Sequence, residues 1–228
     1  DILTGLYATI AVQAALAERA RSGLGQHIDL ALHDVQIACL ANQASNYLAG
    51  GVVPRRMGNA HPNIVPYQDF PTADGDMILA IGNDGQFAMF CAVAAHPEWA
   101  GDPRFATNPQ RVANRSTLIP MLRQATVMRT THDWIAALEA AGVPCGPINR
   151  LDEVFADPHV VSRGLKITMA HPLAGEVPLV ANPIRLSASP VEYRAPPPPL
   201  GAHTGEVLAE WLGTGPEALE GLRSRGVV

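Results

Sequence analysis

The apolar positions that follow Asp1 recur at spacings of three and four residues. They are Leu3, Leu6, Tyr7, Ile10, Ala11 and Ala14. Such spacing places apolar side chains on one stripe of an α-helix. The pattern predicts a helix over residues 3–21 that begins just after Asp1 and ends at the glycines that follow Ser22.

The period of the pattern changes after these glycines. Ile28, Leu30 and Leu32 alternate with more polar or smaller residues, which predicts a half-buried strand over 27–32. A helical pattern returns over 35–49 and stops at Gly50-Gly51. Helix, strand and helix in this order indicate an α/β layer that is part of something larger.

A second unit is predicted downstream. Residues 52–66 are polar and rich in Pro, Gly and Asn, as in a linker or an active loop. Strand candidates over 67–72 and 77–81 are joined through Asp74-Gly75, a common hairpin signal.

Several helices are expected around and after this hairpin. One begins at Asn83 or Asp84, a long one runs from Asn108-Pro109 towards Met128, and one runs from Thr130 or Thr131 to Gly142. A hairpin with several helices makes a small α+β domain. In the last third, we expect a cap at Asp157-Pro158, a stiff spacer at Pro196–Pro199, and helices over 204–212 and 214–225, the last with a capping box from Thr214 to Glu217.

Composition narrows the possible functions. The 228 residues are 47% hydrophobic, enough to bury the core of one or two domains. With a net charge of −5 and one lysine, the chain lacks the basic face of a nucleic-acid binder. Arg55 and Arg56 form its densest basic spot, typical of a solvated loop.

The spacing of the cysteines and histidines shows no metal-binding pattern. The three cysteines are too far apart for a metal knuckle or a redox pair, and the eight histidines form no closely spaced pair, so no metal site is predicted. An odd number of cysteines suits a reducing compartment, so we expect a cytoplasmic protein. No apolar run is long enough to span a bilayer, and residues 1–20 lack the pattern of a signal peptide.

Asp1 is the first candidate for chemistry. Asp commonly occupies the position before a helix, where its side chain satisfies free N–H groups of the first turn. A carboxylate at a helix N-terminus is also held ionised, which suits an anionic nucleophile. The two roles are compatible, and the sequence pattern leaves both open.

Five features in order along the chain resemble the class III CoA-transferases, the CaiB/BaiF-type family. They are the helix, turn and strand after Asp1 and the stretches 58–62, 83–87, 142–147 and 200–208. Each motif alone is common, but five in order across the chain are specific. The chain is therefore identified as a C-terminal portion of such a protein, beginning at the catalytic aspartate.

The resemblance implies an α/β fold in which a Rossmann-like large domain is built from both ends of the chain, with a small α+β domain inserted and two subunits interlocked as a homodimer. Here the large domain would be incomplete: residues 1–54 would close its first half, 55–150 would form the small domain with its linker, and 151–228 would be its returning part. Most CoA-binding residues of such proteins lie upstream of the position of Asp1.

The resemblance also implies chemistry. Asp1, followed by Thr4-Gly5, matches the aspartate that attacks acyl-CoA and carries the acyl group, with CoA as substrate and no permanently bound cofactor. The expected partners are an acyl-CoA and a small carboxylic acid. Gly58, Asn59, His61 and Asn63 are the expected substrate-binding residues, although a Pro-containing turn is an equal explanation of this loop. In formyl-CoA:oxalate transferases the same stretch is a glycine-rich flap, so the departure here argues against oxalate.

Other interpretations remain open. The family includes α-methylacyl-CoA racemases, which pair the matched aspartate with an upstream histidine; the sequence Ile2-Leu3-Thr4 lacks the glycines typical of them. An inactive interaction fragment is the third alternative. Residues 33–34 and 83–86 are weaker site candidates, and helix capping is the favoured role of the latter. Because helix 3–21, strand 27–32 and helix 35–49 each offer an apolar face, we expect those faces to be covered by further chain or by a partner.

Overall fold

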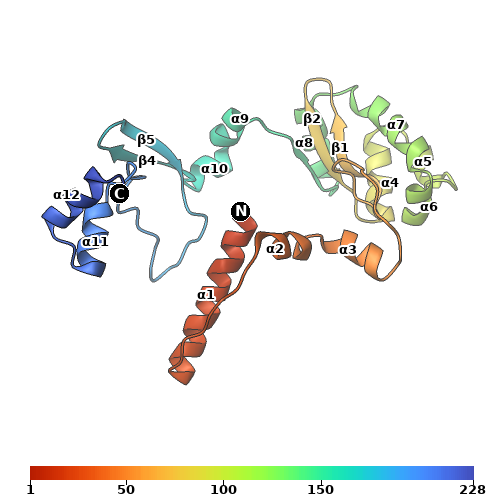
Figure 1. Ribbon diagram of the computed structural model, residues 1–228. Helices are drawn as coiled ribbons and strands as arrows, with labels where there is room; N and C mark the ends of the chain where they lie inside the picture. Colours follow the sequence, from red (N-terminus) through yellow and green to blue (C-terminus); the bar gives the residue numbers. More distant parts are fainter. The chain divides into compact units, whose positions relative to one another are not determined.

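The computed structural model describes all residues from 1 to 228, which divide into two compact units, Asp1–Ile148 and Asn149–Val228 (Figure 1). No helix of the chain is both long and apolar enough to cross a bilayer.

The first unit begins with a long helix, as predicted. Helix α1 (Ile2–Ser22) follows Asp1 and ends at Gly23, whose φ of 78° is left-handed and whose N–H donates to the carbonyl of Arg19. Glycine adopts this conformation without the steric cost that a side chain would bring.

The strand predicted over 27–32 is wrong. This segment has no regular structure, and helix α2 (Leu32–Ala38) already begins at its last residue. A strand needs a neighbour to pair its N–H and C=O groups, and no other strand of this chain pairs here. The helix predicted over 35–49 is also divided, because α3 (Ala41–Leu48) starts separately at Ala41, where φ is 48°.

The hairpin prediction is confirmed. Strands β1 (Tyr67–Pro71) and β2 (Asp76–Ala80) pair antiparallel with Phe70 opposite Met77. A third strand, β3 (Cys145–Pro147), pairs with the other edge of β2. The sequence Pro144-Cys145-Gly146-Pro147 is typical of a tight turn, but residues 145–147 pair with β2 as a strand instead.

Helices α4 to α8 accompany this sheet (Figure 1). Asn83 caps the first, accepting from the N–H of Gln86, and Thr130 caps the last, both as predicted. The single long helix predicted from Asn108 is wrong, because the helix is interrupted at Asn114 and a separate helix follows it. The N-cap of the first helix is Thr107, which forms a capping box with Gln110. The helices are α4 (Asp84–Val93), α5 (Glu98–Gly101), α6 (Asn108–Ala113), α7 (Arg115–Thr126) and α8 (Thr131–Ala140).

The hydrophobic core of the unit lies between this sheet and these helices. Its largest fully buried side chains include Phe70, Met77, Leu79, Phe87, Phe90, Leu118, Trp134 and Leu138. The indole N–H of Trp134 donates to the carbonyl of Thr126 over 2.7 Å, so the one polar atom of that ring is satisfied inside the core. Val65 belongs to this core, so the core holds the C-terminal end of the segment 58–66 in place.

The second unit contains a hairpin that the sequence analysis missed. Strands β4 (Lys166–His171) and β5 (Gly175–Val180) pair antiparallel along their whole length. Burial alternates along β4, and Ile167 and Met169 carry the same period in the sequence.

The helices of this unit follow their caps. Asp157 accepts from the N–H groups of His159 and Val160, as predicted. The capping box expected at Thr214 is wrong, because the last helix begins later, with Pro216 in its first turn. The helices are α9 (Leu151–Ala156), α10 (Pro158–Ser162), α11 (Thr204–Leu212) and α12 (Pro216–Ser224).

Candidate functional site

The carboxylate of Asp1 is free. Asp1 occupies the N-cap position of α1, yet its side chain accepts no hydrogen bond from the first turn. Its backbone carbonyl alone serves the helix, accepting from the N–H of Gly5 over 2.8 Å. The side chain is exposed, so the role of a side-chain cap that the sequence left open is not the one seen here.

Asp1 lines an open hollow of about 720 Å³ between the start of α1 and the start of α2. His33 and Gln36 of α2 line the same hollow, together with apolar side chains. A carboxylate that is exposed, unbonded and at the edge of such a hollow is sterically available to a reacting group.

The second group of predicted residues lies in the loop that precedes β1. Gly58 has a φ of 62°, a left-handed conformation that favours glycine, and Asn59 is exposed. His61 and Asn63 lie together, because the backbone N–H of Asn63 donates to Nδ1 of His61 over 3.1 Å. Nδ1 is therefore an acceptor, which leaves the proton of the neutral imidazole on Nε2.

Helix α3 meets this loop through two asparagines one turn apart. Nδ2 of Asn42 lies 3.4 Å from Nε2 of His61; both nitrogens carry hydrogens when Nδ1 accepts, so this is a contact and not a hydrogen bond. Asn46 and Asn63 exchange two hydrogen bonds, each Nδ2 donating to the Oδ1 of the other over 3.2 and 3.0 Å. Residues four apart share a helix face, so Asn42 and Asn46 meet the loop side by side.

The loop is also anchored to the core through Arg111 of α6. The side chain of Arg111 is fully buried, and its Nε donates to the carbonyl of Val65 over 2.7 Å and its Nη1 to the carbonyl of Phe105 over 2.9 Å. Nη2 donates to Asp84 over 2.8 Å, and the guanidinium lies 4.5 Å from the ring centre of Phe87. Every polar nitrogen of this buried cation thus has a partner.

Two further side chains complete the anchoring. Nδ2 of Asn108 donates to the carbonyl of Asn63 over 2.8 Å, and its Oδ1 accepts from the N–H of Val65. Arg115 donates to the carbonyls of His61 and Pro62 over 2.7 and 3.0 Å. The sequence pattern did not indicate these contacts, because it marked Asn108 only as a helix start and Arg115 follows another polar residue, Asn114.

Two of the weaker candidates, Asn83 and Asp84, have structural partners. Asn83 caps α4 and Asp84 binds Arg111 and the N–H of Asn108, so both serve the frame under the loop. Asp1 and the loop residues share no hydrogen bond, and the hollow that Asp1 lines has no residue in common with the cavity that Asn63 lines. The structure therefore presents two groups, a free carboxylate at α1 and a braced polar loop against α3.

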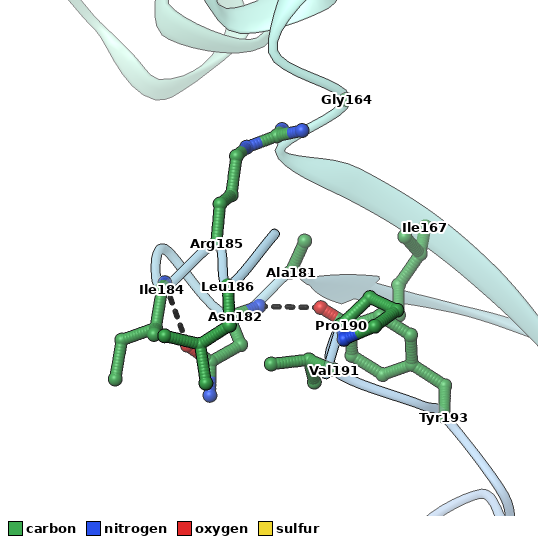
Figure 2. Close-up of a pocket in the computed structure, with 10 residues that line it drawn as sticks. All are labelled: Gly164, Ile167, Ala181, Asn182, Ile184, Arg185, Leu186, Pro190, Val191 and Tyr193. Atoms are coloured by element: carbon green, nitrogen blue, oxygen red, sulfur yellow. Dashed lines mark hydrogen bonds between the residues drawn. The ribbon is translucent and has the colours of Figure 1, made fainter. Parts of the chain in front are cut away.

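The second unit has a cavity of its own, of about 320 Å³, and Figure 2 shows its lining. Its polar groups are occupied by backbone: the hydroxyl of Tyr193 accepts from the N–H of Asn182 over 2.6 Å, and Arg185 donates to the carbonyl of Arg163. None of the residues predicted for the site lines it. No group of three potential metal ligands occurs in the structure.

Comparisons with known proteins identify the family. The sequence profile described as CoA-transferase family III matches residues 1–204. A succinate-glutarate CoA-transferase from Agrobacterium fabrum is 49% identical over 92% of this chain and 52% of its own length. A succinyl-CoA:glutarate CoA-transferase from Homo sapiens is 40% identical over the whole chain and 52% of its own length.

A solved structure agrees. The crystal structure of a CaiB/BaiF family protein from Brucella suis is 48% identical to this chain, with a TM-score of 0.73 over 91% of this chain and 54% of that one. The chain thus spans about half the length of the relatives it matches.

Proposed function

This chain belongs to CoA-transferase family III, and from that premise we propose that the full-length protein moves CoA from an acyl-CoA thioester to a carboxylic acid. The observation that carries the proposal is the 49% and 40% identity to proteins named as CoA-transferases for succinate and glutarate. We extend it to the acceptor: a dicarboxylic acid of the size of succinate or glutarate.

Asp1 is the proposed nucleophile. Its carboxylate attacks the carbonyl carbon of the thioester, forming a mixed anhydride and releasing the CoA thiolate. The thiolate then attacks the aspartyl carbonyl, which gives an aspartyl thioester and frees the donor acid. The acceptor carboxylate repeats the sequence in reverse, leaves as its CoA thioester and regenerates Asp1. Dividing the transfer into these steps avoids a direct attack of the CoA thiolate on the acceptor carboxylate, which is a poor electrophile. The free, exposed side chain of Asp1 supports this role.

The loop is the proposed substrate-binding element. His61 and Asn63 offer side-chain donors to a carboxylate or to a developing oxyanion, while Gly58 and Asn59 shape the turn that presents them. Donors that are already fixed lose little freedom when charge develops, and the contacts from Arg115 and Asn108 provide that fixation.

Exposed apolar surface supports a proposal for the assembly. Ile2, Leu6 and Ile10 of α1 are 83%, 57% and 65% exposed. Such a face seldom stays open to water. We propose that it is covered in an interlocked homodimer whose small domain comprises residues 55–150 between large-domain pieces 1–54 and 151–228, with the enzyme in the cytoplasm.

The test uses the full-length protein with succinyl-CoA and glutarate labelled with ¹⁸O in its carboxylates. We expect glutaryl-CoA to form, with ¹⁸O appearing in succinate by way of Asp1, and the Asp1→Ala protein to form none while its far-ultraviolet circular dichroism is unchanged. Substantial turnover by Asp1→Ala would overturn the assignment of the nucleophile. Rapid α-deuteration of a chiral 2-methylacyl-CoA in deuterated water without any acceptor acid would overturn transfer in favour of racemisation.

A further inference from the structure

A small cavity lies where α3 meets the loop. Its volume is about 300 Å³, at the lower end of the range of small-molecule sites. Val52 and Val53 give it apolar walls, and its polar lining consists of Gln43, Asn46, Arg55 and Asn63. The cavity and the proposed substrate loop therefore share Asn63.

Arg55 gives this cavity its only charge. None of the other residues that line it is ionisable, and Arg55 forms no ion pair in the structure. A guanidinium without a carboxylate partner presents a planar fork of N–H donors that matches an incoming carboxylate.

The amides beside Arg55 also have donors to spare. Each Nδ2 of the Asn46–Asn63 pair donates once to the other, so one N–H on each remains unused. The side chain of Gln43 makes no hydrogen bond within the chain and supplies two more. A cavity that offers a cation and amide N–H donors but no carboxylate is suited to binding an anion.

We propose that this cavity binds the carboxylate of the acceptor acid that does not react, with Arg55 as the specificity-determining cation and the amides of Gln43, Asn46 and Asn63 as supporting donors. The inference rests on the proposed function, which assigns Asp1 and this loop to one substrate in the assembled full-length enzyme, and deepens it. A dicarboxylic acid places its second charge on Arg55 and its methylene groups along Val52 and Val53, whereas a monocarboxylic acid leaves Arg55 unpaired.

The experiment compares Arg55→Gln with Arg56→Gln in the full-length enzyme. Both variants remove one arginine charge from adjacent exposed positions, but Arg56 does not line the cavity. Because a hydrogen bond to a charged group is lost, Arg55→Gln should raise the KM for glutarate by roughly 10- to 100-fold. It should leave the KM for butyryl-CoA, whose acyl group has no second carboxylate, and for the monocarboxylic acid pentanoate within about twofold, and Arg56→Gln should leave all three values unchanged.

Direct binding separates this inference from the proposed function. Calorimetric titration of the unreacted enzyme with glutarate alone should show the same loss of affinity in Arg55→Gln, independently of turnover. An equal rise of the KM for butyryl-CoA and for glutarate would overturn the inference in favour of a site for CoA phosphates, and an unchanged KM for glutarate would overturn it outright. If the wild-type enzyme transfers CoA to no acid, the proposed function fails instead, whatever the binding data show.

Discussion

The buried guanidinium of Arg111 and the carboxylate of Asp84 join two helices of the first unit, with Nη2 of Arg111 donating to Oδ1 of Asp84 over 2.8 Å. The arginine side chain is 0% exposed and its partner 53%. Only one of the two charges is therefore desolvated, and it is the one that also binds the carbonyls of Val65 and Phe105. The pair therefore supports the loop at Val65 and differs from a surface salt bridge, in which both charges are solvated.

Arg111→Met should destabilise the first unit. The substitution fills similar space but leaves the carbonyls of Val65 and Phe105 without donors, so the free energy of unfolding should fall by about 2–5 kcal/mol. The matched control is Arg123→Met, which removes a half-exposed pair with Asp69 at 3.3 Å and should cost at most about 1 kcal/mol. Urea denaturation of both variants measures the difference, and equal losses would contradict the role assigned to Arg111.

Arg115→Met should loosen the loop without unfolding the protein. Arg115 donates to the carbonyls of His61 and Pro62, and no other side chain that binds these two carbonyls is present. We expect faster amide hydrogen exchange across residues 58–64 and a kcat lowered about 10-fold, with the melting temperature nearly unchanged. Arg150→Met, an exposed arginine of the second unit, is the control. Unaltered exchange in the loop would show that Asn108 and α3 suffice to hold it.

Cys91 should resist thiol reagents while the protein is folded. It is fully buried in α4, and burial raises the pKa of its thiol to about 12. The reactive thiolate is therefore scarce at pH 8, and access is closed as well. Mass spectrometry after brief iodoacetamide treatment should find Cys91 unmodified in buffer and modified in roughly 8 M urea, which unfolds most domains. Modification in buffer would indicate that α4 opens locally.

Local signals in the sequence were sufficient for the elements that they specify. Asp74-Gly75 between apolar runs predicted the β1–β2 hairpin, and Asn83, Thr130 and Asp157 predicted three helix starts. Each of these depends on residues within a few positions of one another. The free state of the Asp1 side chain could not be predicted in this way, because a cap position does not oblige its side chain to bond.

Features that depend on distant partners were beyond the sequence pattern. The alternation over 27–32 suits a strand, but a strand forms only where another strand pairs with it. Cys145 became part of β3 because β2 offers a free edge, which its own turn-like neighbours do not reveal. The anchors Arg111 and Arg115 act over 46 and 54 residues of sequence on Val65 and His61, so only the fold shows what they bind.

Acid should remove one specific contribution to stability, at Asp74. Its Oδ1 accepts from the N–H and the hydroxyl of Thr131 at the start of α8, over 2.7 and 3.0 Å, and thereby joins the hairpin turn to that helix. The backbone hydrogen bond from Thr131, with help from the hydroxyls of Thr131 and Thr72, lowers the pKa of the Asp74 carboxyl below its ordinary value of 3.8. A carboxyl whose pKa is lower in the folded state stabilises the fold above its unfolded pKa, and that stabilisation is lost as the pH falls through the folded value.

The measurement is the difference in unfolding free energy between the wild-type protein and Asp74→Asn, taken by urea denaturation at pH values from 7 downwards. The asparagine keeps an oxygen acceptor and does not titrate, so the variant isolates the charge. We expect the wild-type protein to be the more stable at pH 7, with a gap that is constant down to the ordinary pKa of 3.8 and narrows below it. A gap that widened with acid, or that stayed constant well below that value, would mean that Asp74 binds Thr131 as strongly when protonated as when ionised.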